Sequence, residues 1–169
     1  MATTDSAASH HSLVLPLLIR SMYGHLLDSS GYALVQEMVK DGTLQTDRLY
    51  EHYEAKRFGC EVESVYGHDL SDGKEVKLRT LIECTRANGP TTYEAKLLGS
   101  ETKSKDGPII FGVINPFTNN LDRFLIPLDS SGSSYYGYVP GKSVSISWNT
   151  KKQTYGSKWD RFRIESVAL

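Results

Sequence analysis

The chain has little cysteine: two residues in 169, Cys60 and Cys84, far apart in the sequence. They form no CxxC pair and no zinc-ligand spacing, so we expect two reduced thiols in the core rather than a metal site or a disulfide scaffold. A chain without a disulfide framework is typical of intracellular proteins, and we expect a cytoplasmic location.

Long apolar runs are also missing. The longest runs from Leu13 to Ile19, which is too short to cross a bilayer. No basic segment precedes it and no clear cleavage site follows it, so we expect neither a signal peptide nor contact with a membrane.

The chain as a whole also has no large excess of positive or negative charge, since its formal net charge is −1. The distribution is uneven, because residues 28–75 hold eleven acids and five bases whereas residues 137–169 hold six bases and two acids. Such a distribution can combine an acidic, metal-binding region with a basic, phosphate-binding surface.

The order of predicted elements is helices first and strands afterwards. Residues 1–11 are small and polar and predict a disordered tail, and residues 12–169 suit a single domain. Apolar spacing predicts helices over about 12–27, 32–40 and 46–57, the last stopped by Gly59. Strands are predicted over 61–66, 74–84, 109–114, 123–128, 144–148 and 162–167, while 91–98 fits a strand or a short helix. This order indicates an α/β or α+β fold with a mixed sheet.

The chemistry is concentrated in one hairpin. Along the strand that follows Gly73, Glu75, Lys77 and Arg79 share one face, and Val76, Leu78 and Ile82 share the other, apolar face. A two-residue turn, Asp72-Gly73, would place Asp69 on the opposite face from Glu75. A three-residue turn, Ser71-Asp72-Gly73, would place Asp69 directly across from Glu75.

In the second case two carboxylates lie with their side-chain roots about 5 Å apart. Like charges that close repel each other unless a cation lies between them, and a hard divalent ion with oxygen ligands would resolve the conflict. Lys77 would then lie beside a metal-activated water and orient it or stabilise developing negative charge. These parts suit in-line attack on a phosphodiester.

The order Asp69, Glu75-Val76-Lys77 resembles the motif of the PD-(D/E)XK nucleases, and the short gap resembles the MutH-like group with short hairpins. His68 stands where the motif has its proline. The resemblance implies a restriction-endonuclease-like fold, a mixed central β-sheet flanked by helices. It implies Asp69 and Glu75 as ligands of Mg²⁺, with Mn²⁺ as a substitute, and Lys77 as the water-orienting residue. The family often adds an acid from a preceding helix, and the candidates are Glu37, Glu51 and Glu54.

The implied activity is Mg²⁺-dependent hydrolysis of phosphodiester bonds in double-stranded DNA by a type II restriction endonuclease. A homing or repair nuclease of the same fold is the alternative. A restriction enzyme would often pair as a homodimer, for which the exposed face of the helix over 12–27 is a candidate. Rivals from other classes are a non-catalytic binding module and a β-rich hydrolase with its pocket elsewhere. Residue type and position suggest seven DNA contacts: Arg86, Asn88, Lys103, Lys105, Lys151, Lys152 and Lys158.

Overall fold

The computed structural model describes residues 13–21, 29–42, 45–65, 68–85 and 87–169. Residues 13–21 are helical. The helices that follow are α2 (Ser29–Lys40), α3 (Thr46–Phe58), α4 (Gly99–Thr102) and α5 (Ser157–Asp160). The strands are β1 (Val62–Val65), β2 (His68–Leu70), β3 (Glu75–Thr80), β4 (Ile82–Cys84), β5 (Thr92–Leu97), β6 (Ile109–Asn115), β7 (Asn120–Ile126), β8 (Val144–Asn149), β9 (Thr154–Tyr155) and β10 (Arg163–Ala168).

Two four-stranded sheets form the body of the protein. The first, which we call the β3 sheet, has the order β10-β7-β6-β3, and the second, the β5 sheet, has the order β4-β5-β8-β9. In the β3 sheet, β3 runs parallel to β6 whereas the other neighbours are antiparallel. The prediction of an α+β protein with a mixed sheet is therefore confirmed.

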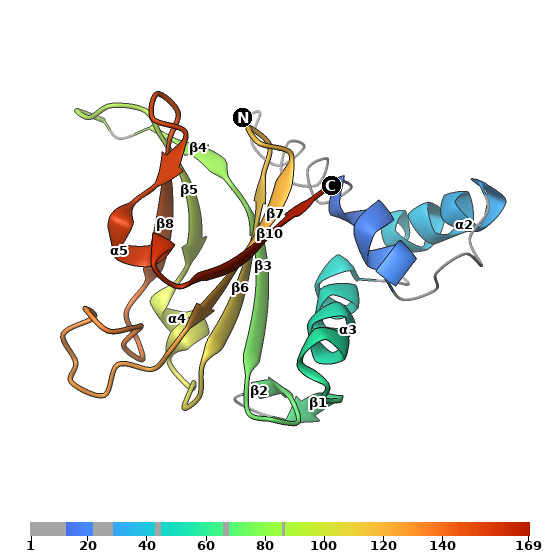
Figure 1. Ribbon diagram of the computed structural model, residues 1–169, viewed down its shortest axis with the longest axis horizontal. Helices are drawn as coiled ribbons and strands as arrows, with labels where there is room; N and C mark the ends of the chain where they lie inside the picture. The colour runs from blue at the N-terminus through green and yellow to red at the C-terminus, as the bar shows by residue number, and fades with distance from the viewer. Residues whose placement is uncertain (1–12, 22–28, 43–44, 66–67, 86) are drawn as a thin grey trace.

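The β3 sheet has a hydrophobic core on each face. On one face, residues of the 13–21 helix and of α3 pack against Val76, Leu78 and Ile110. On the other face, Phe111 and Phe124 pack against Ile146 and other residues of the β5 sheet. Figure 1 shows α3 and the β5 sheet on opposite sides of the β3 sheet.

This layering corrects the expectation of a sheet flanked by helices, because in the part of the chain that the structure describes the second face is covered by strands. The physical reason is visible in β8, where buried and more exposed residues alternate along Val144–Asn149. A segment with that period buries one face as a strand and could not present a continuous apolar stripe as a helix.

The predicted single strand over 74–84 is wrong, because it is broken at Leu81. The Leu81 N–H donates to the Ile114 carbonyl, 3.0 Å away, and the Leu81 side chain is buried between the two sheets. One residue outside the alternation reverses the faces that follow, so Ile82, predicted to pack with Val76 and Leu78, is 45% exposed. The chain thereby passes from the β3 sheet into the β5 sheet.

The length of a segment separates the remaining elements that were predicted from those that were not. Helix α3 ends as predicted at Gly59, which has a φ of 67°, and the segment that fitted strand or helix is the strand β5. The elements β9, α4 and α5 were not predicted because two to four residues are too few to show a period. The predicted tail over 1–11 lies outside the described residues, and so do residues 22–27 of the first predicted helix.

The two cysteines agree in part with the expectation of reduced thiols in the core. Cys60 and Cys84 form no disulfide, as expected, but each is partly exposed rather than buried in a core. None of the described helices combines the length and the apolar character that crossing a membrane requires.

Candidate active site

The turn between β2 and β3 decides where Asp69 lies. The Gly73 N–H donates to the Leu70 carbonyl at 2.9 Å, and the Leu70 N–H donates to the Lys74 carbonyl at 3.0 Å. These bonds close a three-residue turn over 71–73, in which Gly73 has a φ of 87° that residues with a side chain rarely adopt. Leu70 is thus opposite Lys74, and Asp69 and Glu75 are the next residues on either side of the turn. The two-residue alternative is wrong.

Strand β3 lies at the edge of its sheet, where it pairs with β6 and packs against the helices. The Glu75 N–H donates to the Pro108 carbonyl at 3.0 Å, where the parallel pairing with β6 begins. Val76 and Leu78 are buried against the helices, so the alternation turns Glu75 and Lys77 to the other face. The position of the acidic and basic groups therefore follows from the apolar residues between them.

Asp69, Glu75 and Lys77 form a charged group. The Lys77 Nζ lies 2.5 Å from Oε1 of Glu75 and 4.0 Å from Oδ2 of Asp69. The Val76 N–H donates to the same Asp69 oxygen at 2.9 Å. The three residues taken from the sequence motif therefore lie together.

A fourth member of this group is Lys105, whose Nζ lies 2.7 Å from Oε1 of Glu75. Its side chain is only 14% exposed, although the sequence suggested a surface contact to DNA. The loop before β6 brings Lys105 to Glu75 because β6 begins beside Glu75. No local sequence pattern predicts this pairing. We call Asp69, Glu75, Lys77 and Lys105 the acid–lysine cluster.

The structure separates the three helical acids that the sequence left open. Glu54 is fully buried and bound by Arg123, with Oε1 2.7 Å from the Arg123 Nε. Glu37 is exposed on α2. Glu51, on α3, is close enough for the charge of Asp69 to help raise its pKa, although burial is the larger cause. Of the three, Glu51, which pairs with Arg48, is the acid whose charge interacts with that of Asp69.

Burial and charge together shift two pKa values in the cluster. Burial raises the pKa of Asp69, and the charge of Glu75 adds to this against the lowering effect of the Val76 N–H. Burial lowers the pKa of Lys77, but its hydrogen bond and attraction to Glu75 outweigh burial, so the pKa is raised overall. Lys77 is therefore a cation at neutral pH, whereas ionisation of Asp69 is disfavoured in the folded protein, chiefly by burial.

These groups have the chemistry to hold a hard divalent cation, since Asp69, Glu75 and Glu51 offer carboxylate oxygens and the first two repel each other. The residues that the structure describes contain no cluster of three His, Cys, Asp or Glu side chains arranged as a metal site. In the structure the ammonium groups of Lys77 and Lys105 compensate Glu75 instead. Metal binding would require at least one lysine to move away from Oε1.

A stability measurement tests whether the folded protein raises the pKa of Asp69. Because its folded-state pKa lies above the ordinary 3.8, folding is favoured by the protonated form, and that contribution is lost as pH rises through the folded-state pKa. We expect Asp69→Asn to unfold at a higher temperature than the unmodified protein at neutral pH. The gain should shrink in acid, where Asp69 is protonated. Thermal unfolding followed by circular dichroism at neutral and mildly acidic pH measures both.

Asp72→Asn is the matched control on the same hairpin. Burial raises the pKa of Asp72, but hydrogen bonding and attraction to Lys74 lower it overall, so ionisation of Asp72 favours folding. We expect this variant to unfold at a lower temperature than the unmodified protein at neutral pH. If both variants lower the unfolding temperature at neutral pH, the folded protein does not disfavour the ionised form of Asp69.

The remaining predicted DNA contacts are dispersed. Lys151 and Lys152 form the tip of the β8–β9 hairpin, and Asn88 and Lys103 are exposed in other loops. Lys158 lies on α5, its Nζ 4.5 Å from the centre of the Trp159 ring. Arg86 lies outside the described residues.

Comparison with protein-family models, with curated proteins and with solved structures finds no match to this chain.

Proposed function

We propose that the protein is a Mg²⁺-dependent endonuclease that hydrolyses phosphodiester bonds in double-stranded DNA. The observation that carries the proposal is the position of the Lys77 Nζ, within 4.0 Å of both the Asp69 and the Glu75 carboxylates. An ordinary surface ion pair needs only one carboxylate. The second one, Asp69, is held across a tight turn although its ionised form opposes folding.

In this proposal Asp69 and Glu75 hold the metal ion, with Glu51 as the helical acid, and Mn²⁺ can replace Mg²⁺. The ion would supply Lewis acidity and an activated water. Glu75 is only 3% exposed, and its Oε1 is held by the ammonium groups of Lys77 and Lys105. Lys77 is 24% exposed at its side chain, so its ammonium group can reach a substrate, orient the attacking water and stabilise charge that develops on the phosphate.

A type II restriction endonuclease is the member of this class that we favour, acting in the cytoplasm as a homodimer that cuts both strands. A homing or repair nuclease would use the same residues. Discrete fragments from plasmid and phage DNA would favour restriction, whereas nicked circles or a smear would favour repair or non-specific cutting.

The second candidate is a non-catalytic DNA-binding module. It is favoured by the two lysines that hold Oε1 of Glu75, at 2.5 and 2.7 Å, because a buried carboxylate with two cationic partners can be purely structural. In that case neither Mg²⁺ nor Mn²⁺ would be needed for any property of the protein.

Incubation of supercoiled plasmid with the protein separates the two. We expect nicking or linearisation in Mg²⁺, none in EDTA, and none with Asp69→Ala in either buffer. Cleavage that persists in EDTA or in Asp69→Ala would remove the proposed mechanism. Absence of cleavage in both Mg²⁺ and Mn²⁺, across several DNA substrates, would favour the non-catalytic module.

A further inference from the structure

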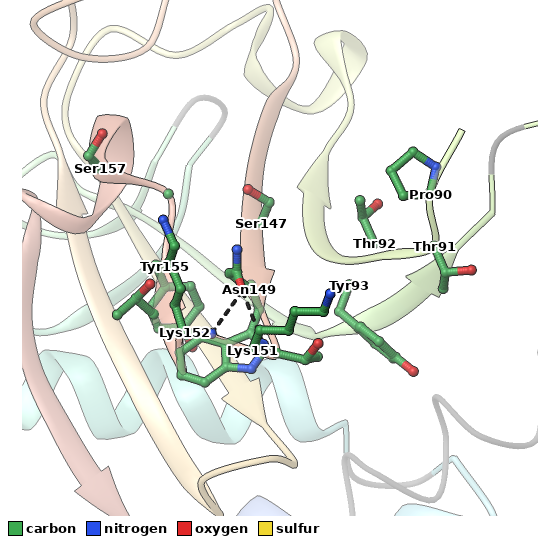
Figure 2. A pocket seen from close by; sticks show the side chains of 14 residues that line it. Pro90, Thr91, Thr92, Tyr93, Ser147, Asn149, Lys151, Lys152, Tyr155 and Ser157 are labelled. Atoms are coloured by element: carbon green, nitrogen blue, oxygen red, sulfur yellow. Dashed lines mark hydrogen bonds between the residues drawn. The ribbon is translucent and has the colours of Figure 1, made fainter. Parts of the chain in front are cut away.

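An open groove of about 630 Å³ lies on the β5 sheet. Its walls come from the start of β5, the end of β8 and the β8–β9 hairpin, and Figure 2 shows Thr92 and Tyr93 on one side with Lys152 and Tyr155 on the other. None of the lining residues belongs to the acid–lysine cluster. Figure 1 shows β4 and the β8–β9 hairpin at one end of the molecule and the β1–β2 corner, next to the cluster, at the other.

The charged side chains that line the groove are all positive. Lys151 and Lys152 line it, and no acidic side chain is among its lining residues. Neither lysine forms an ion pair with a described residue, although the chain as a whole has a net charge of −1. The groove is therefore suited to an anionic occupant.

The two lysines are presented by an ordered turn rather than by a loose loop. The Asn149 Oδ1 accepts hydrogen bonds from the N–H groups of Lys151 and Lys152, at 3.0 and 2.9 Å, as the dashed lines in Figure 2 show. Gln153 follows with a φ of 55°, and its side chain donates to the Thr150 carbonyl at 3.0 Å. A turn held in this way lowers the entropy cost when the lysines engage a ligand.

Aromatic rings lie beside the lysines. Tyr93 lines the groove and is partly exposed, and Phe117, 41% exposed, meets it edge to face with ring centres 4.7 Å apart. Phe117 also stacks on Trp148, whose ring is otherwise buried. The hydroxyl groups of Thr154 and Ser147 add hydrogen-bonding partners along the walls, whereas the Thr92 hydroxyl donates to the Glu94 Oε1 at 3.0 Å.

We propose that this groove binds single-stranded nucleic acid, with Lys151 and Lys152 at consecutive phosphates and Tyr93 against an unpaired base or its sugar. Lysines beside an accessible aromatic ring are the combination that grips a strand without reading its sequence. An unpaired strand is favoured over a duplex because only an unpaired base offers its face to a ring. The inference goes beyond the proposed cleavage and does not depend on it.

Fluorescence anisotropy with a short labelled oligothymidine, in EDTA and at several salt concentrations, tests the groove. We expect Lys151→Gln/Lys152→Gln to weaken binding about tenfold at low salt. The slope of log affinity against log salt should fall by about 1.4, because each phosphate that a lysine neutralises on a single strand contributes about 0.7. Tyr93→Ala should weaken binding by roughly tenfold because the stacking surface is removed, whereas Tyr93→Phe, which keeps the ring, should bind as the unmodified protein does.

The matched control is Lys40→Gln/Lys96→Gln, which removes the same charge from two exposed lysines outside the groove. Equal weakening by the two double variants would show that only net charge matters and would overturn the proposal. So would a duplex of equal length that binds as tightly as the single strand with the same dependence on Lys151 and Lys152. Because EDTA removes divalent ions, the result is independent of whether the protein cuts DNA.

Discussion

Replacing Lys77 with methionine is expected to lower the single-turnover rate of DNA cleavage by roughly 10²- to 10³-fold, the usual cost of removing one preorganised charged donor. Methionine keeps the length of the side chain but removes the ammonium group that lies 2.5 Å from Glu75 and 4.0 Å from Asp69. The loss should appear in the rate and not in the affinity for DNA. Conversion of supercoiled plasmid by excess enzyme in Mg²⁺ measures the rate, and gel shift in Ca²⁺ measures the affinity.

Two comparisons make this result specific. Lys96→Met, on the exposed face of β5, should cleave at the rate of the unmodified protein. Lys105→Met removes the other cation on Glu75, and its side chain, 14% exposed against 24% for Lys77, is less able to reach a substrate, so we expect a smaller loss. A Lys77→Met protein that cleaves within a few-fold of the original rate would exclude the catalytic role.

Replacing Arg123 with methionine is expected to lower the free energy of unfolding by about 3–5 kcal/mol, because it leaves a buried carboxylate without its partner. Glu54 is fully buried, and both its oxygens accept from Arg123, at 2.7 Å from Nε and 2.5 Å from Nη2. Arg123 also reaches Glu165 on β10. The variant therefore loosens α3 from β7, and urea unfolding at neutral pH measures the loss.

The surface partner of Glu165 provides the control. Arg57 pairs with Glu165 at side-chain exposures of 37% and 36%, so Arg57→Met should cost no more than about 1 kcal/mol. The double variant Arg123→Met/Glu54→Met, which removes both buried charges, should recover most of the stability that the single variant loses. A single variant that costs no more than Arg57→Met would show that the pair is not effectively buried.

This ion pair also explains why Glu54 is not available to the cluster. Glu51 and Glu54 are three residues apart on α3, and the sequence offered no reason to choose between them. Arg123, on β7 and distant in the sequence, pairs with Glu54 in the core. Glu51 does not join this pair, and the charge of Asp69 helps to raise its pKa. The choice was made by a long-range contact, which a local pattern does not contain.

Packing between α3 and the β3 sheet depends on another residue without a sequence signal. A Cβ added to Gly112 on β6 would come within 2.5 Å of the Tyr50 ring of α3. The absence of a side chain at that point allows the helix to approach the sheet closely. The sequence shows a glycine within a strand, but only the fold shows which ring lies against it.

Local patterns determined the elements of this protein that are long enough to show a period, together with the residues of the hairpin. Helix α3 ends at Gly59 because only a residue without a side chain readily takes its positive φ, and Val76 and Leu78 turn Glu75 and Lys77 to a common face because strands alternate. Both Asp72-Gly73 turns were compatible with those patterns, however, and the hydrogen bonds of the folded hairpin selected the longer one.

The tertiary structure alone decided what surrounds that hairpin. The break at Leu81, the second sheet over the β3 sheet, the approach of Lys105 to Glu75 and the groove beside Lys151 all depend on pairing between segments distant in the chain. Periodicity reports which face of a segment is apolar. It does not report which other segment will cover that face, because that is set by the packing of the whole chain.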